Sequence, residues 1–155
     1  MVEKLLGVIG GSGLYQMKGL EVIEKVTVNT PFGSPSDCII IGKLAGVKLA
    51  FLPRHGVGHV IPPSEINFRA NIFAMKKIGV ERIISVSAVG GMKENMPPGH
   101  FVVPHQFIDR TYKRISTFFT EGMVGHVSMA DPVCLPTAGT LFNAAQKAGA
   151  DVHEG

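Results

Sequence analysis

The sequence predicts an α/β fold: a single domain with a twisted, mixed β-sheet flanked by helices. Short apolar runs typical of buried strands alternate with segments of helical periodicity along the 155 residues. Hydrophobic residues make up 45% of the chain and charged residues 17%, a composition typical of a globular protein with a real core. Small residues and glycine pairs follow two of the apolar runs, as expected where strands of such a sheet end.

The expected strands are short apolar runs bounded by turn residues. The runs at 38–41 and 47–52 are separated by a segment between Gly42 and Gly46, which predicts a β-hairpin. In chain order, the predicted strands are 5–9, 22–28, 38–41, 47–52, 82–86 and 101–103.

Two segments have helical signals. Residues 65–78 carry apolar side chains at near-helical spacing, with Ser64 as the expected N-cap and Gly79 after the last turn. Residues 141–148 form the second predicted helix. Residues 151–155 resemble the residues that precede a further strand, but no such strand follows them in the sequence. We therefore expect the sheet to be truncated.

Composition excludes several classes of protein. No apolar run approaches the length of a membrane span, and the first residues lack the features of a secretory signal, so we expect a cytoplasmic protein without membrane contact. Cys38 and Cys134 are far apart and predict buried thiols, not a disulfide framework. The formal charge of +3 comes from scattered basic residues, which argues against nucleic-acid binding and suits a small anion.

A glycine turn, Gly10, Gly11, Ser12 and Gly13, follows the first strand. Backbone N–H groups in such a turn can converge on an anion, and the Ser12 hydroxyl adds a donor. The turn is not a dinucleotide fingerprint, because Gln16 stands where the third glycine belongs, and no Lys-Ser or Lys-Thr pair follows to make a Walker loop. A purely structural turn explains the glycines as well, so both interpretations stay open.

A basic cluster, Arg54, His55 and Gly56, follows strand 47–52, and His59 comes shortly after it. Arginine grips phosphate with a two-pronged hydrogen bond, and histidine adds a donor of tunable charge. The alternative is a solvated basic loop, but open α/β sheets bind ligands beyond strand ends. A metal site at the two histidines is not favoured, since carboxylate and thiol ligands are lacking beside them.

A third cluster follows strand 82–86, where Ser87 and Ala88 precede Gly90 and Gly91. Small residues let a ligand approach the backbone closely, although a close-packed strand end is the alternative. Three strand ends that each offer anion donors together favour one anion-binding site.

The remaining polar segments have structural explanations. Asp109 and Arg110 are expected to form an internal ion pair, and His100 and His105 are expected to be structural. From the residues alone, His126 can be structural or functional.

Seven motifs together resemble those of the methylthioadenosine phosphorylase family of trimeric-type purine nucleoside phosphorylases. They occur in family order and cover nearly the whole chain, and the ordered set is far more specific than any one motif. They are VIGGSGL at 8–14, TPFGSPS at 30–36, RHG at 54–56 with His59, INFRANI at 66–72, SVSAVG at 85–90, QFIDRT at 106–111, and His126 with MADP at 129–132.

The resemblance implies a purine nucleoside phosphorylase-like fold and a role for each matching position. Ser12, Arg54, His55, Ser87 and Ala88 would bind phosphate, with the last two also near the ribose, and His59 would sit beside the same pocket. His126 would reach into a neighbouring subunit and cover the 5'-substituent of the nucleoside. The phosphate-binding residues implied are Ser12, Arg54, His55, Ser87 and Ala88, and the substrate-binding residues are His59, Ser87, Ala88 and His126.

The implied reaction is phosphate-dependent cleavage of 5'-methylthioadenosine to adenine and 5-methylthioribose 1-phosphate, in purine and methionine salvage. Phosphate is a co-substrate, so neither a metal nor an organic cofactor is implied. Family members run well past Gly155, so we expect residues 1–155 to be the N-terminal part of the domain, with the purine-binding residues beyond it. Alone, this chain is expected to bind phosphate weakly at most and to turn over no substrate usefully.

Three places depart from the family pattern: Val57, where many relatives have a basic residue, the segment 91–93, and His105. The last two bear on the base. The segment 91–93 and His105 resemble a sister branch that acts on methylthioinosine, whereas residues 129–132 favour the adenosine branch. A methylthioinosine or 6-oxopurine nucleoside phosphorylase therefore remains an alternative. A non-catalytic phosphate- or nucleotide-binding module is the alternative from another class.

We expect the complete protein to be a homo-oligomer, either a trimer or a hexamer made of two trimers. The reason is the implied role of His126 in a neighbour's pocket, because a composite site needs a closed symmetric ring. Light scattering measures the mass, and a fully active monomer would contradict the expectation.

Overall fold

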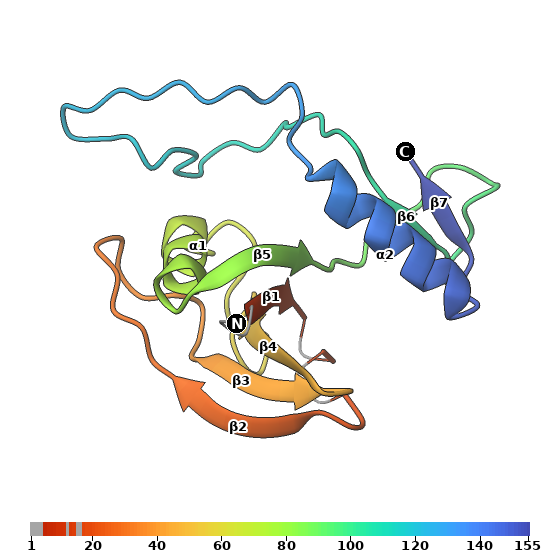
Figure 1. The fold of residues 1–155 in the computed structure, drawn as a ribbon. Coiled ribbons are helices and arrows are strands. Elements are labelled where there is room, and N and C mark those ends of the chain that lie inside the picture. Colours follow the sequence, from red (N-terminus) through yellow and green to blue (C-terminus); the bar gives the residue numbers. More distant parts are fainter. Residues whose placement is uncertain (1–4, 12, 15–16) are drawn as a thin grey trace. The chain divides into compact units, whose positions relative to one another are not determined.

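The computed structural model describes residues 5–155 except 12, 15 and 16, and these form two compact units, each with its own sheet (Figure 1). The first unit holds the described part of Met1–Ala88 together with Lys113–Phe118. The second holds Val89–Tyr112 and Phe119–Gly155.

The first unit is built on a five-stranded mixed sheet in the order β2-β3-β4-β1-β5 (Figure 1). β1 lies parallel to β4 on one side and to β5 on the other, whereas β2, β3 and β4 form an antiparallel meander. The predicted mixed sheet and its hairpin are therefore confirmed. The strands are β1 (Leu5–Gly10), β2 (Glu21–Val26), β3 (Ile39–Leu44), β4 (Val47–Pro53) and β5 (Val80–Ser85).

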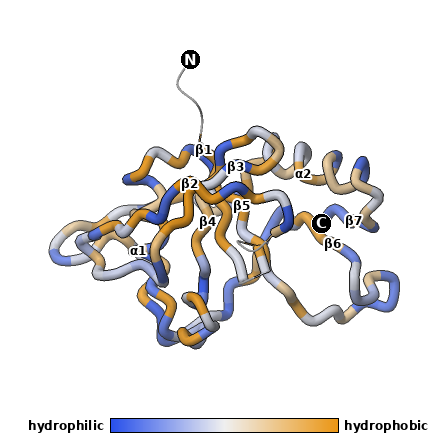
Figure 2. The backbone as a smooth tube through the Cα atoms, turned by 90° about the horizontal axis from the view of Figure 1, so that it is seen from below, coloured by the Kyte–Doolittle hydropathy of each residue, from blue (hydrophilic) through white to orange (hydrophobic). Residues whose placement is uncertain are grey.

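The central strands of this sheet contribute buried apolar residues to two clusters, and Figure 2 shows the hydropathy of each residue along the backbone. On β4, Ala50 and Leu52 belong to one buried cluster, whereas Leu49 and Phe51 belong to another. The alternation follows from the two-residue period of a strand, whose successive side chains point to opposite faces. Strands that are apolar on both faces belong in the interior of an α/β sheet.

The helix α1 (Phe68–Lys77) packs on the first of these clusters through Ala74 and Met75. Its close approach to β1 depends on Gly7. A Cβ atom at that position would lie 2.8 Å from Val80 Cγ1 and 3.4 Å from Met75 Sδ. A larger residue would therefore push the helix and β5 away from the central strand.

The N-terminus of α1 differs from the prediction, because Asn67 and not Ser64 is the N-cap. The Asn67 side chain accepts a hydrogen bond from Ala70 N at 3.1 Å and donates one to Phe32 O at 2.6 Å. The residues before it turn, with Glu65 N donating to Pro62 O at 3.0 Å, and this turn keeps them out of the helix. The cap thus also attaches the loop at Phe32 to the start of α1.

The second unit contains β6 (Phe101–Val103), α2 (Leu135–Lys147) and β7 (Val152–Glu154), with β7 parallel to β6. Two predictions were wrong here. The helix begins at Leu135 and not at 141, with a proline in its first turn, where a missing N–H costs nothing. Residues 151–155 were expected to stop short of a strand, yet they contain β7, which the pairing with β6 stabilises.

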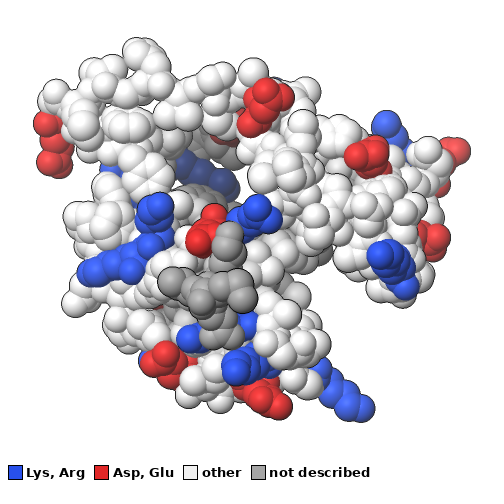
Figure 3. All heavy atoms as spheres, in the orientation of Figure 1, with Lys and Arg blue, Asp and Glu red and all other residues white. Residues whose placement is uncertain are grey.

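The charged side chains on the face drawn in Figure 3 are spread over several separate places, with both signs present. That distribution lacks the single basic stripe typical of nucleic-acid-binding surfaces. Within the described part of the chain, neither helix has the length and apolar character required to cross a membrane.

Replacing Phe51 with alanine should lower the free energy of unfolding by about 3–5 kcal/mol, because it empties a fully buried site. The matched control is Val47→Ala, on the same strand and the same face but 52% exposed, which should cost only about 0.5 kcal/mol. Urea denaturation of each variant measures the difference. Equal losses would show that the apolar cluster around Phe51 is not a core.

Candidate anion-binding site

Three strand ends meet at one edge of the first sheet. Because β1, β4 and β5 are parallel, their carboxyl ends share this edge. The backbone pairing continues just past the strands: Arg54 N donates to Gly10 O, and Val86 N donates to Ile9 O, each at 2.9 Å. The three predicted clusters are thereby brought to one place, as far as the structure describes them.

Arg54 is the central side chain of this edge. Its Nη1 atom donates to the Oγ atom of Ser87 and, at 3.4 Å, to the carbonyl of Val86. Its Nε atom donates to His55 Nε2 at 3.3 Å. The guanidinium is thus held across the end of β1, between the segments that follow β4 and β5.

His55 is buried, with 8% of its surface exposed, and both of its ring nitrogens are engaged. Nδ1 lies 2.8 Å from the carbonyl oxygen of Ile61 and must donate, because a carbonyl can only accept. Nε2 is therefore free of hydrogen and accepts from Arg54. The ring also stacks on His59, with centroids 4.2 Å apart and planes 19° apart. In this arrangement His55 orients Arg54, and its direct contact with phosphate stays a prediction.

The glycine turn after β1 is only partly described, and Ser12 lies outside the described residues, so its role stays a prediction. Gly10 sits close to the segment after β5, where an added Cβ atom would lie 3.3 Å from Val86 O. Around Gly11, by contrast, an added Cβ would meet nothing within 4 Å. Gly10 is therefore closely packed, whereas the chain has space beside the Cα atom of Gly11.

Three further predicted residues are exposed. Ala88 follows Ser87 beyond β5, and His59 lies on the loop after β4 with a φ of 58°, an uncommon backbone conformation for a side chain of this kind. His126 belongs to the second unit, on the segment between β6 and α2, and its role in a neighbour's site stays a prediction.

Two polar residues to which the sequence analysis assigned no role support the loop of Arg54. The Asp37 carboxylate accepts from Val57 N at 2.7 Å, and Asn71 of α1 is 2% exposed and bonded to Ser36. Burial raises the pKa of Asp37, but the backbone hydrogen bonds from Val57 and Cys38 outweigh it and hold the pKa below its ordinary value. Of these two residues, only Asn71 had a signal in the sequence. Its spacing from Ala74 places it on the apolar side of α1.

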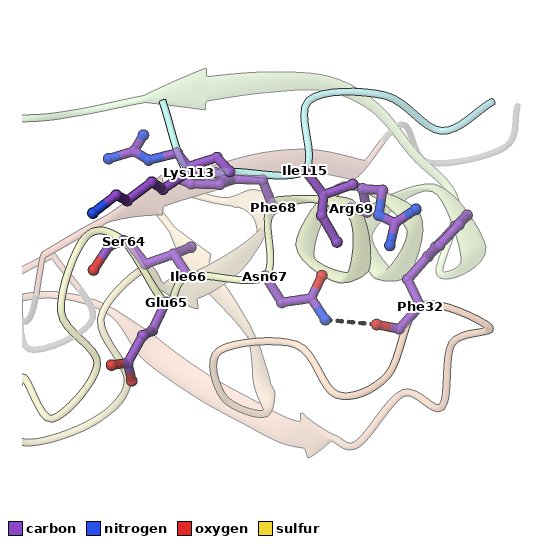
Figure 4. A pocket seen from close by; sticks show the side chains of 10 residues that line it. Phe32, Ser64, Glu65, Ile66, Asn67, Phe68, Arg69, Lys113 and Ile115 are labelled. Atoms are coloured by element: carbon purple, nitrogen blue, oxygen red, sulfur yellow. Dashed lines mark hydrogen bonds between the residues drawn. The ribbon is translucent and has the colours of Figure 1, made fainter. Parts of the chain in front are cut away.

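A separate pocket of about 330 Å³ opens at the start of α1, as seen in Figure 4. Arg69, Lys113 and Arg114 give it a basic lining, opposed by Glu65. The basic groups are already engaged within the unit: Arg69 lies over the Phe32 ring at 4.8 Å, and Arg114 lies over Phe68 at 5.2 Å. The pocket wall therefore fixes the loop at Phe32.

Among the described residues, no group of three or more His, Cys, Asp and Glu side chains is arranged to hold a metal ion. The two cysteines are not disulfide-bonded. Cys134 is exposed and Cys38 is only partly buried, so the prediction of two buried thiols was wrong. Cys134 precedes α2 as the N-cap residue, a position at the surface of the unit.

Comparisons with known proteins agree on one family. A family model described as "Phosphorylase superfamily" matches residues 5–155. The chain is 57% identical over 155 residues to the S-methyl-5'-thioadenosine phosphorylase of Geobacter sulfurreducens, covering 99% of this chain and 54% of that protein. It is 53% identical over 152 residues to the S-methyl-5'-thioadenosine phosphorylase of Hyperthermus butylicus, covering 98% of this chain and 56% of that protein.

Solved structures give the same result. A methylthioadenosine phosphorylase from an antarctic soil metagenomic library superposes with a TM-score of 0.91 at 50% identity, covering 98% of this chain and 54% of that one. The methylthioadenosine phosphorylase of Schistosoma mansoni in complex with adenine gives 0.90 at 37% identity, covering 98% and 63%. The chain thus spans about half the length of the curated relatives it matches.

Replacing Arg54 with alanine should weaken phosphate binding by about 2–5 kcal/mol, as found when one partner of a close charge pair is removed. Arg82→Ala, on exposed β5, removes the same charge from the same unit and should change the affinity little. Isothermal titration with inorganic phosphate measures both variants in the complete protein. Equal effects would mean that general charge, and not the position of Arg54, attracts the anion.

Proposed function

This chain belongs to the phosphorylase superfamily, and from that membership we propose that the protein carrying it cleaves 5'-methylthioadenosine with phosphate. The products are adenine and 5-methylthioribose 1-phosphate. The observation that carries the proposal is the meeting of Arg54 and Ser87 at the carboxyl edge of three parallel strands. The relatives described above bear the name of this activity, which supports the choice of substrate.

Arg54 and Ser87 are proposed to bind the phosphate that attacks C1' of the nucleoside. A guanidinium offers two parallel donors to two phosphate oxygens, and the serine hydroxyl adds a third. Held in this way, phosphate faces one side of the ribose ring. Proximity and orientation of this kind can supply about 7–11 kcal/mol of the barrier, which is why positioning is the main task of this half of the site.

The second task is to stabilise the departing purine. The transition state of glycosyl transfer resembles an oxocarbenium ion, and the purine gains negative charge as its bond to C1' breaks. A proton or a hydrogen-bond donor at the purine ring would meet that charge. We assign this task to residues in the part of the relatives' length that this chain does not span. None of residues 1–155 is proposed to perform it.

The composite pocket is part of the same proposal. His126 would serve the pocket of a neighbouring subunit, which requires a trimer or a hexamer. The ring of His126 is exposed, as a side chain that covers a ligand of another subunit must be before assembly.

A panel of nucleosides offered with phosphate to the complete protein tests the proposal. We expect methylthioadenosine to be cleaved with a kcat/KM about tenfold or more above that of inosine, because an active site that binds the exocyclic amine rejects an oxygen there. Preference for methylthioinosine would instead support the sister branch indicated by residues 91–93 and His105.

Two controls separate the other outcomes. Omitting phosphate should abolish cleavage, and release of base without phosphate would indicate a hydrolase. Binding of phosphate without cleavage of any nucleoside would identify a non-catalytic binding module and overturn the proposal.

A further inference from the structure

The loop that carries Arg54 and His55 is fastened to a second loop by one carboxylate. Asp37 Oδ2 accepts from Val57 N at 2.7 Å, and Asp37 Oδ1 accepts from Cys38 N at 2.7 Å. Each oxygen of the side chain therefore receives one backbone N–H, one from the adjacent Cys38 and one from Val57, which is 20 residues away from Asp37. Hydrogen bonds to an ionised acceptor are stronger than neutral ones, so this is the firmest described attachment of Val57.

The two loops are also in direct contact. Gly56 has a φ of +70°, which favours glycine, and a Cβ atom there would lie 3.2 Å from Ser36 O. Its N–H donates to Pro53 O at 3.1 Å, which closes a turn around Arg54 and His55. The turn thus rests against Ser36 on one side and is held by Asp37 on the other.

The second loop is itself fixed from α1. Asn71 accepts from Ser36 N at 2.8 Å and donates to Ser36 Oγ at 2.9 Å. Asn71 is 2% exposed, so its amide has no water with which to replace these bonds. Hydrogen bonds therefore join α1 to Ser36 and Asp37 to Val57, and the chain itself connects Ser36 to Asp37 and Val57 to the turn that contains Arg54.

We propose that Asp37 is a positioning residue for phosphate: by holding Val57 it fixes the turn that presents Arg54 to the anion. This inference rests on the proposed function. Asp37 touches neither phosphate nor nucleoside in this proposal and acts only through the backbone of the turn.

The proposal and simple electrostatics predict opposite changes in phosphate affinity when Asp37 is neutralised. An aspartate near an anion site repels phosphate, so its neutralisation should improve binding if charge alone mattered. If Asp37 positions the turn, the same change should weaken binding. Asp37→Asn keeps the size of the side chain but removes its charge and places an NH₂ group opposite either Cys38 N or Val57 N. One of the two bonds is therefore lost, and the other becomes a weaker bond to a neutral acceptor.

The charge state of Asp37 supports this role at neutral pH. The groups that face it are Lys25 of β2, which lowers its pKa, and the Cys38 thiol, whose own pKa burial and Asp37 raise. With its pKa below the ordinary value, Asp37 stays ionised at neutral pH. The pKa of Asp37 is lower in the folded protein than in the unfolded chain. Its contribution to the stability of the fold is therefore fully present above the ordinary pKa and is lost as pH falls through the pKa of the folded state.

The test compares Asp37→Asn with Glu24→Gln in the complete protein. The control removes one negative charge from an exposed position of β2 in the same unit. For Asp37→Asn we expect the phosphate KM to rise about tenfold or more, the worth of a hydrogen bond to a charged group, while kcat at saturating phosphate stays within about twofold. The control should leave KM unchanged or slightly lower.

A second measurement does not depend on how the variant folds. In the unsubstituted protein, NMR should show the Val57 amide and Arg54 Nε–H signals moving together as the Asp37 carboxyl titrates, below the ordinary range of aspartate. An unchanged or lowered phosphate KM in folded Asp37→Asn, or signals that ignore this titration, would overturn the inference. If inorganic phosphate added to the unsubstituted protein shifts the Arg54 Nε–H signal but no nucleoside is cleaved, only the proposed function fails.

Discussion

The candidate site depends on how β1 is paired: parallel strands are hydrogen-bonded to it on both sides. The register sets Gly10 against Pro53 and Ile9 against Ser85, so Arg54 and Ser87 lie just beyond one common edge. A slip of one residue would send every side chain of β1 to the opposite face. Gly7 would then no longer face Met75, and a larger residue in its position would prevent α1 from packing closely on the sheet. The same register thus determines both the packing and the site.

The surroundings of Arg54 orient its side chain without neutralising it. Its described hydrogen-bond partners are a hydroxyl, a carbonyl and the unprotonated nitrogen of His55, all of which are neutral. The nearby carboxylate of Asp37 is satisfied by backbone N–H groups and not by the guanidinium. A carboxylate paired with Arg54 would compete directly with an anionic ligand. The arrangement therefore keeps the positive charge available while restricting where it points.

The sequence predicted what local periodicity and turn chemistry decide. The β3–β4 hairpin and the strand Phe101–Val103 were confirmed, because short apolar runs bounded by turn residues specify such elements locally. The start of α1 at Asn67 depends on the carbonyl of Phe32, and β7 depends on pairing with β6. Neither partner is adjacent in the chain, so neither outcome was visible in a short window of sequence.

The same distinction applies to the site. Arg54 and Ser87 were predictable, because residues after parallel strands meet at one edge once the sheet is assumed. Asp37 was not, since a lone aspartate in a turn has no pattern that names a distant backbone N–H as its partner. The residues proposed to bind phosphate thus left a trace in the sequence, whereas the residue proposed to hold them in place did not.

The central position of β1 also has a consequence for how the chain acquires its structure. The β2–β3–β4 meander is made of neighbours in sequence and can form early, but β1 must wait for partners far along the chain. On a ribosome, β1 emerges first and is completed only after β5 has followed. Before β4 is made, both edges of this apolar strand are unpaired, and until β5 follows one edge stays open. Such a species is prone to aggregation and is a typical substrate of chaperones.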